Sequence, residues 1–404
     1  MPDVWLPHPG HLVVTAFLLL SALQAGSVPT PRPGPNPRQP RFDAGTFDSL
    51  VEGGIRRGAY PGAALVVGRR DTVLFAKGYG RLTWSAASAG SRVDADSTIY
   101  DLASLTKVIA TTTSLMLLVD RGKVRLDAAV ATYVPEFSGS GTAAITVRHL
   151  LTHTSGLRAT LPLYRDARDA GDALRIVFAE RPVVPPGTRV IYSDLNAILL
   201  GEIVRRASGE LLDAFASREV LTPLGLEHTL FRPPPTLRPR IAPTGAWHGH
   251  PVAGVVNDQN AAKLGGVAGH AGLFGTATDL ARFAQFMLRR GALPDGRHLV
   301  TPETVRLFTT KAVDFGRGTE ARALGWQAVP TGEKTSSAGV LFGPHSYGHT
   351  GWTGTSLWID PDRDLFVVLL TNRAYAPRAR RPFTVLKEVR GGVADAAARA
   401  SDAR

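Results

Sequence analysis

The chain has 404 residues, of which 44% are hydrophobic and 20% charged, and it contains no cysteine. This usage is ordinary for a globular protein with one large domain or two modest ones, and it excludes disordered, collagen-like and fibrous proteins. Without cysteine there is no disulfide, no thiolate nucleophile, no thiolate metal site and no lipid-bearing cysteine. Any nucleophile must therefore be an oxygen or an amine.

The net charge is +12, from 46 Lys and Arg against 34 Asp and Glu. A basic chain can bind nucleic acid, but here the basic residues are scattered and form no stripe interleaved with aromatic residues. Because the motifs of nucleic-acid recognition are missing, we expect no nucleic-acid partner.

The first residues have the features of an export signal. Leu12 to Leu23 form an apolar run too short to cross a bilayer, and the small residues Ala25 to Ser27 follow it. We therefore predict a signal peptide over 1–27 and a proline-rich linker over 28–41, with an uncleaved anchor or a wrongly chosen start codon as alternatives. The expected location is periplasmic or secreted, with no stable membrane span after cleavage.

The body begins with a helix and two strands. Apolar spacing predicts a helix over Phe42–Arg57, and β-rich runs predict strands over Gly62–Val67 and Thr72–Tyr79, joined by a hairpin at Gly68–Asp71. A long helical stretch follows over Leu102–Arg121.

Helical patterns continue through the middle third, at Ala197–Ala207 and Leu211–Val220. The pattern then returns to strands, which we expect at Leu324–Val329, Ser346–His349, Thr353–Ile359 and Leu365–Thr371, before a closing helix over Val385–Ala400. The fold class is therefore α/β (α+β): an α/β part from 42–110 and 280–400, and a mostly helical part over 111–279. A cleft is expected where the two parts meet.

Ser104 and Lys107 lie three residues apart at a helix start, so their side chains share one face. A serine needs a base to become a nucleophile, and burial and the helix dipole would lower the pKa of a lysine placed there. The alternative is that Ser104 caps the helix and Lys107 is solvated.

Two further segments carry polar side chains at expected turns. Tyr192 and Asp194 follow a Pro-Pro-Gly turn and open a helix, where the phenol can shuttle a proton if cations stabilise its phenolate. The segment Gly348–Thr355, GHTGWTGT, joins two expected strands, and its glycines let a ligand approach the backbone. The alternatives are a packed tyrosine at a helix start and a glycine-rich turn with a structural His and Trp.

In this order, Ser104-x-x-Lys107, Tyr192-Ser193-Asp194 and His349-Thr350-Gly351 resemble the signature of the penicillin-binding protein and serine β-lactamase superfamily. The resemblance runs from about Phe42 to Phe383 and includes the segments Pro61–Ala63, Ile145–Leu157, Leu221–Leu226 and Trp358–Pro361. The tyrosine motif resembles class C β-lactamases, family VIII carboxylesterases and DD-peptidase-like hydrolases. Asn257–Phe274 resembles a subgroup with penicillin-binding protein 4B-like proteins and muropeptide amidases.

The resemblance implies an antiparallel sheet flanked by helices, built from both termini, with an inserted mostly helical domain. It also implies that Ser104 is acylated, that Lys107 and Tyr192 exchange its proton, and that no cofactor or metal is needed. The backbone N–H groups of Ser104 and Trp352 would form the oxyanion hole. Substrate-binding roles fall on Asp194, His349, Thr350, Gly351 and His270.

Two positions depart from the family pattern. His349 replaces the usual lysine, so a substrate carboxylate should bind more weakly above about pH 7 if this histidine titrates normally. Asp194 replaces the usual asparagine and cannot donate a hydrogen bond. Both changes argue against efficient β-lactam hydrolysis.

Other histidines and acids carry no catalytic motif. The spacing of Asp258, Asn260 and His270 matches no standard metal site, and we expect His270 to line the cleft. His149 and His153 are expected to belong to the end of a structural helix.

The sequence therefore predicts an exported serine hydrolase that cleaves an ester or amide through a Ser104 acyl-enzyme. Its expected substrate is a small molecule or a peptidoglycan fragment. Alternatives are β-lactamase or DD-peptidase activity, or a peptidoglycan-binding sensor that does not turn over. The sequence leaves the oligomeric state open.

Overall fold

The structure is a computed structural model, and it describes residues 43–85, 92–248, 250–316, 320–330, 336–375 and 383–403. The predicted signal peptide and linker lie outside these residues. Within them, no helix combines the length and apolar character needed to cross a membrane.

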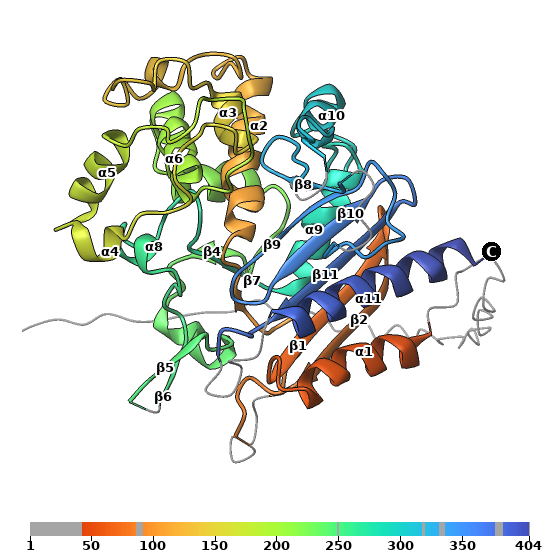
Figure 1. Ribbon diagram of the computed structural model, residues 1–404. Coiled ribbons are helices and arrows are strands. Elements are labelled where there is room, and N and C mark those ends of the chain that lie inside the picture. Colours follow the sequence, from red (N-terminus) through yellow and green to blue (C-terminus); the bar gives the residue numbers. More distant parts are fainter. Residues whose placement is uncertain are drawn as a thin grey trace, which may run out of the picture. The chain divides into compact units, whose positions relative to one another are not determined.

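A six-stranded antiparallel sheet forms the centre of the molecule (Figure 1). Its order is β2–β1–β11–β10–β9–β8, and its strands are β1 (Gly62–Arg69), β2 (Thr72–Gly80), β8 (Gln327–Ala328), β9 (Tyr347–Thr350), β10 (Ser356–Asp360) and β11 (Leu365–Thr371). The two ends of the chain meet in the middle of this sheet, where Ala63 of β1 pairs with Thr371 of β11. All of β11 and nearly all of β1 are buried, as expected for central strands covered on both faces.

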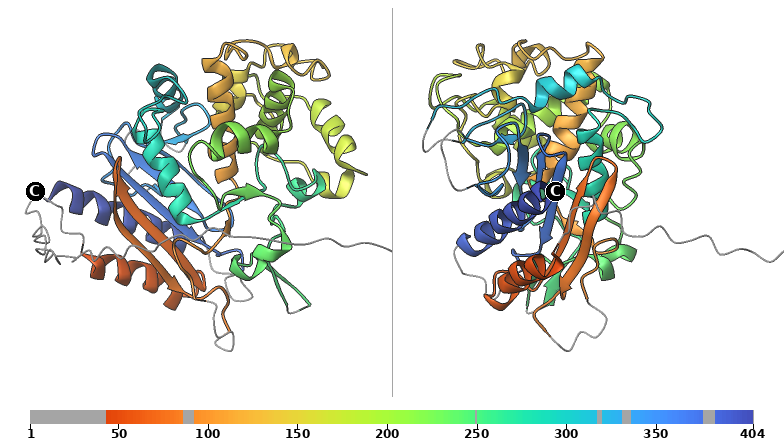
Figure 2. Two further views of the ribbon diagram at one scale, coloured as in Figure 1. Left: turned by 180° about the vertical axis from the view of Figure 1, so that it is seen from behind. Right: turned by 90° about the vertical axis from the view of Figure 1, so that its right-hand side faces the viewer.

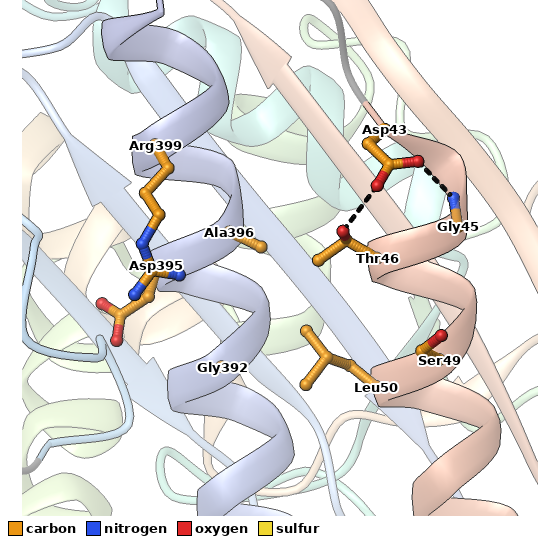
Figure 3. Close-up of a pocket in the computed structure, with 9 residues that line it drawn as sticks. All are labelled: Asp43, Gly45, Thr46, Ser49, Leu50, Gly392, Asp395, Ala396 and Arg399. Atoms are coloured by element: carbon orange, nitrogen blue, oxygen red, sulfur yellow. Dashed lines mark hydrogen bonds between the residues drawn. The ribbon is translucent and has the colours of Figure 1, made fainter.

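Helices cover both faces of the sheet. The terminal helices α1 (Ala44–Arg56) and α11 (Thr384–Asp402) pack against each other on one face, and α9 (Ala277–Leu288) packs against β1 and β11 on the other (Figure 2). Between α1 and α11 lies a shallow surface pocket of about 590 Å³ (Figure 3). One hydrophobic core lies under the terminal helices, and the larger one continues from α9 into the helical part.

The helical part lies beside one end of the sheet (Figure 1). Its longer elements are the π-helical turn η1 (Lys107–Thr112), α2 (Thr113–Asp120), α3 (Val147–Leu151), α4 (Leu163–Asp166), α5 (Ala170–Phe178), α6 (Asp194–Ser208), α7 (Leu212–Ala216), α8 (Gln259–Lys263) and α10 (Pro302–Thr309). Helix α6 packs against α2, α3, α7 and η1 and is buried along most of its length. It ends at Gly209, whose φ of +79° lies in the left-handed region that glycine adopts without strain.

Short strands tie the helical part to the start of η1. A small sheet has the order β3–β7–β4, with β3 at Tyr100–Asp101, β7 at Leu273–Gly275 and β4 at Leu230–Phe231. Strands of two or three residues are too short for an alternating pattern, so the sequence did not reveal this sheet. Because of this small sheet, the segment before β7 lies against the residues that precede Ser104.

The expected fold class is confirmed, and most expected elements are present. The first helix, the β1–β2 hairpin, β11 and the closing helix agree with the expected ranges within a few residues. The expected strand Leu324–Val329 shrinks to the two residues of β8. The expected helix Leu102–Arg121 begins near Leu105 and passes through a π-helical turn before α2.

Candidate active site

Ser104 stands on a strained turn at the start of η1. Ala103 has a φ of +48°, a conformation that costs a non-glycine residue about 1–2 kcal/mol. The buried carboxylate of Asp101 accepts the Ala103 N–H at 2.8 Å, and Thr106 Oγ1 donates to the Ala103 carbonyl at 2.6 Å. These two bonds hold the turn, which leaves Ser104 partly exposed.

The ammonium group of Lys107 hydrogen-bonds three groups of the site. Its Nζ donates to Ser104 Oγ at 2.9 Å, to Asp194 Oδ1 at 2.8 Å and to the His270 carbonyl at 3.2 Å. Burial works to lower the pKa of Lys107, but the Asp194 carboxylate outweighs it and the net pKa lies above the usual value. The expected lowering of this pKa is therefore wrong: Lys107 is 3% exposed and is held as an ammonium ion.

Asp194 is the first residue of α6, where a carboxylate also interacts favourably with the helix dipole. Its backbone N–H donates to the Ala159 carbonyl at 2.8 Å, which fixes the start of the helix. Burial raises the pKa of Asp194, but Lys107 and then His270 outweigh it, so the net pKa lies below the usual value. The carboxylate expected to contact substrate is thus bound to Lys107.

Tyr192 lies among cations and imidazole rings. Its ring centroid is 4.9 Å from Lys107 Nζ and 5.0 Å from Arg322 Cζ. The rings of His153 and His349 lie 4.7 Å and 5.7 Å from the same ring. The structure therefore brings together the three motifs that the sequence separates by about 90 and 160 residues.

His349 is buried and neutral rather than a titrating cation. Its Nδ1 hydrogen-bonds the Thr350 carbonyl at 2.8 Å, and it is 3% exposed. Burial first, and then the Arg322 guanidinium, hold the pKa of His349 well below its usual value. The expected loss of its charge near pH 7 is therefore wrong, since the ring is already neutral at lower pH.

Arg322 is a site residue that the sequence analysis missed, because no motif marks it. The side chain is 2% exposed, and its Nη2 pairs with Glu320. Its Nε and Nη1 are buried, and neither has a hydrogen-bond partner within the described ranges. Arg322 pairs with Glu320 and Lys107 pairs with Asp194, so these four charges balance beside Tyr192. What remains is the two unpartnered guanidinium nitrogens, which can still donate hydrogen bonds to a ligand.

The turn after β9 is fastened to the residues before Ser104. Thr353 Oγ1 donates to the Asp101 carbonyl at 2.7 Å, and Thr355 Oγ1 donates to the Leu102 carbonyl at 3.0 Å. A Cβ on Gly351 would lie 2.7 Å from the Leu102 carbonyl oxygen, so only glycine permits this approach. Trp352, between Gly351 and Thr353, is 64% exposed.

His270 is buried rather than lining the cleft, which corrects the expectation. It is 1% exposed, and its Nε2 hydrogen-bonds Asp258 Oδ1 at 3.0 Å. Its neighbours bind the nucleophile region: Asn257 N–H donates to Asp101 Oδ2 at 2.7 Å, and Leu273 N–H donates to Thr106 Oγ1 at 3.1 Å. The segment 257–273 therefore supports Ser104 and Lys107 from behind.

The remaining histidines of the sequence analysis divide between two roles. His149 is structural as expected, because its Nδ1 accepts the Thr146 N–H at 3.2 Å in the capping box of α3. His153 is buried and its Nδ1 accepts the Ser193 N–H at 3.1 Å, which places its ring against Tyr192. Across the residues with described coordinates, no group of three or more acidic or histidine side chains is arranged to hold a metal ion.

Known proteins resemble this chain in sequence. The family model described as Beta-lactamase matches residues 47–390. A protein of Escherichia coli (strain K12) called "Putative D-alanyl-D-alanine carboxypeptidase" is 32% identical over 362 residues, covering 79% of this chain and 80% of that protein. Its counterpart from Escherichia coli O157:H7 is 33% identical over 356 residues, with the same coverage of both chains.

Solved structures share the fold at lower identity. A penicillin-binding protein homologue from Caulobacter crescentus superposes with a TM-score of 0.69 at 21% identity, covering 87% of this chain and 97% of that one. A class C β-lactamase gives a TM-score of 0.67 at 22% identity, covering 85% of this chain and 94% of that one.

Proposed function

Since the chain belongs to the β-lactamase family of serine hydrolases, we propose that it is a carboxypeptidase that releases the last D-alanine from peptides ending in D-alanyl-D-alanine. The observation that carries this proposal is the buried Arg322 guanidinium, with two unpartnered nitrogens next to Tyr192. A carboxypeptidase must bind a terminal carboxylate, and a guanidinium N–H donates a strong, charge-assisted hydrogen bond to a carboxylate. Because Nη2 already pairs with Glu320, one of the two unpartnered nitrogens would make this bond.

The reaction proceeds through an acyl-enzyme. Ser104 Oγ attacks the carbonyl of the last peptide bond, and its proton passes to Lys107 or Tyr192 in the fraction of molecules in which that group has first lost its own proton. The protonated group later gives the proton to the departing D-alanine amine. The N–H groups of Ser104 and Trp352 receive the oxyanion of the tetrahedral intermediate, where one such donor is worth about 3 kcal/mol. Water then hydrolyses the ester on Ser104 and restores the serine.

In this proposal Arg322 takes the place that a lysine fills in the family motif. His349 is neutral and cannot supply the charge, whereas Arg322 presents a guanidinium with two unpartnered nitrogens against the same tyrosine ring. The carboxylate of a peptide would therefore bind without the pH dependence expected of a titrating histidine. Asp194, held by Lys107, stays in this proposal as a group that sets the proton affinity of the lysine.

The test compares two substrates that differ in the carboxylate. We would measure kcat/KM for diacetyl-L-lysyl-D-alanyl-D-alanine and for p-nitrophenyl butyrate with wild type, Ser104→Ala, Arg322→Met and the exposed control Arg297→Met. Ser104→Ala should abolish both activities. Arg322→Met should lower the peptide-to-ester ratio by about tenfold to a hundredfold, the loss expected for one charge-assisted hydrogen bond.

Two results would count against the proposal. An unchanged peptide-to-ester ratio in Arg322→Met would mean that the guanidinium does not bind the substrate carboxylate. Ester hydrolysis without any release of D-alanine would favour an esterase. A chromogenic cephalosporin, which also bears a carboxylate, serves as a third substrate: rapid opening would favour β-lactamase activity, and a lasting adduct on Ser104 would favour a binding or sensing protein.

Export of the protein belongs to the same proposal. The proposed substrate is a cell-wall peptide outside the cytoplasmic membrane, and the apolar run Leu12–Leu23 has the length of a signal-peptide core. Fractionation of the producing cells should find a shortened chain outside the cytoplasm. A full-length cytoplasmic chain would contradict export without affecting the assigned chemistry.

A further inference from the structure

Arg390 of α11 lies directly behind the turn that follows β9. Its Nη2 donates to the Gly351 carbonyl at 3.2 Å and to the Thr355 carbonyl at 2.6 Å. The Gly351 N–H also donates to the Thr355 carbonyl, at 2.7 Å, which closes the turn. One guanidinium therefore hydrogen-bonds both carbonyl groups, of Gly351 and Thr355, at the two ends of the turn that carries Trp352.

The Gly351 carbonyl and the Trp352 N–H belong to the same peptide group. A cation that hydrogen-bonds the carbonyl oxygen draws electron density from the amide and makes its N–H a stronger donor. In the proposed function this N–H is the second donor of the oxyanion hole. Arg390 thus acts on the oxyanion hole through a single peptide bond, without touching substrate.

Within the described segments, no acidic side chain neutralises the charge of Arg390. The side chain is 4% exposed, and no carboxylate of the described segments pairs with it. Its guanidinium lies 5.5 Å from the Phe383 ring centroid, and its Nε is buried without a partner in the described structure. Burial, followed by repulsion from Arg373, lowers the pKa of Arg390 to about 9.

An uncompensated buried cation is costly, and proteins usually pair such a group with a carboxylate. Here the unpaired charge lies behind the place where negative charge develops during acylation. Charge that is preorganised in a desolvated site stabilises a developing oxyanion more than it stabilises the neutral ground-state carbonyl.

We propose that Arg390 is a positioning residue that strengthens the oxyanion hole through the Gly351–Trp352 peptide group. The inference rests on the proposed function, because it requires the Trp352 N–H to receive the oxyanion. In this proposal Arg390 stabilises the transition state and does not contribute to substrate binding. Its removal should therefore lower kcat and leave KM nearly unchanged.

The experiment uses three substitutions and one control on the same helix. Arg390→Met removes the charge and the donors, Arg390→Gln keeps a neutral donor, and Arg390→Lys keeps the charge. The control Arg399→Met removes an exposed arginine of α11 that lines the pocket beside α1 (Figure 3). For each protein we would measure kcat and KM with p-nitrophenyl butyrate, inhibition by phenylboronic acid, and the melting temperature.

Phenylboronic acid is the decisive probe because it forms a tetrahedral adduct with a serine oxygen and resembles the intermediate. Arg390→Met should lower kcat by about fourfold to eightfold, which corresponds to a donor weakened by about 30%. Its inhibition constant should rise by the same factor, while KM stays within about twofold of wild type. Arg390→Lys should regain most of the loss, and Arg399→Met should match wild type.

Several outcomes would overturn the inference. They are a wild-type kcat in Arg390→Met, a loss confined to KM, or an equal loss in Arg390→Lys and Arg390→Met. If Arg390→Met does not fold, the comparison of Arg390→Gln with Arg390→Lys still tests the inference. Equal kcat values in these two variants would show that the charge at this position is irrelevant. Retained activity in Ser104→Ala would instead overturn the proposed function, so the two failures are distinguishable.

Discussion

Replacing Asp194 by asparagine would release Lys107 from its ion pair. The substitution keeps the size of the side chain and removes the charge that now holds the proton on Lys107. The pKa of Lys107 should therefore fall, because burial then acts without the opposing carboxylate. If neutral Lys107 is the base that accepts the Ser104 proton, more enzyme will be in the reactive form at neutral pH.

The size of the expected fall in the pKa of Lys107 follows from the geometry of the Lys107–Asp194 ion pair. The two groups are 2.8 Å apart, and the side chains are 4% exposed for Lys107 and 24% exposed for Asp194. Removing one partner of a buried ion pair costs about 3–5 kcal/mol, and the partial exposure of Asp194 reduces this to about 2 kcal/mol. Because about 1.4 kcal/mol is a factor of ten, kcat/KM at pH 7 should rise about thirtyfold.

The assay is the pH dependence of kcat/KM for p-nitrophenyl butyrate between pH 5 and 10. For wild type, activity should rise with pH as Lys107 loses its proton, and in Asp194→Asn the same rise should occur at lower pH. Asp127→Asn is the matched control, because Asp127 pairs with Arg148 at the surface with a side chain that is 77% exposed. A profile that does not move in Asp194→Asn, or moves equally in the control, would refute the assignment of Lys107 as the base.

Three further substitutions test other parts of the structure. Tyr192→Phe should lower kcat about a hundredfold by removing a proton-transfer group, with KM within a few-fold of wild type, and an unchanged kcat would remove Tyr192 from the mechanism. Burial raises the pKa of Asp101 to about 6, above its unfolded value near 4, so the stability due to its protonated form is lost as pH rises through 6. The melting temperature of wild type should therefore decline between pH 4 and 7 by more than that of Asp101→Asn, and parallel declines would contradict this. Leu199→Ala, in the fully buried part of α6, should lower the free energy of unfolding by about 2–5 kcal/mol in denaturant titration, whereas a loss below 1 kcal/mol would show that the core can collapse around the gap.

The sequence predicted the motifs of the site because each is local. Ser104 and Lys107 share a helical turn, and the Tyr192 and His349 motifs each lie at a junction that glycine or proline marks. The β1–β2 hairpin and β11 were predicted because their apolar runs are long and bounded by turn residues. The family resemblance connected these segments, and the structure brings their side chains within contact of one another.

What the sequence could not predict depends on contacts between distant segments. Arg322 carries no local signal, and its role follows only from its position against the Tyr192 ring. The protonation of Lys107 depends on the Asp194 carboxylate that faces it after folding, and the neutrality of His349 depends first on its burial and then on Arg322. The sequence analysis could not know either environment. The burial of His270 likewise follows from its bond to Asp258 and from the short strand β7 beside it.

The pairing of β1 with β11 also governs how the chain can fold. Ala63 meets Thr371, so the central strand of the sheet has no partner on one side until nearly the whole chain has been made. At about 5–20 residues per second, the β1–β2 hairpin waits about 15–60 seconds after its own synthesis. During that time β1 presents an apolar open edge, which is the kind of surface that recruits other chains into aggregates. Folding is therefore a late, long-range event with a high contact order, and a chain that stops before Leu365 should not form a stable sheet.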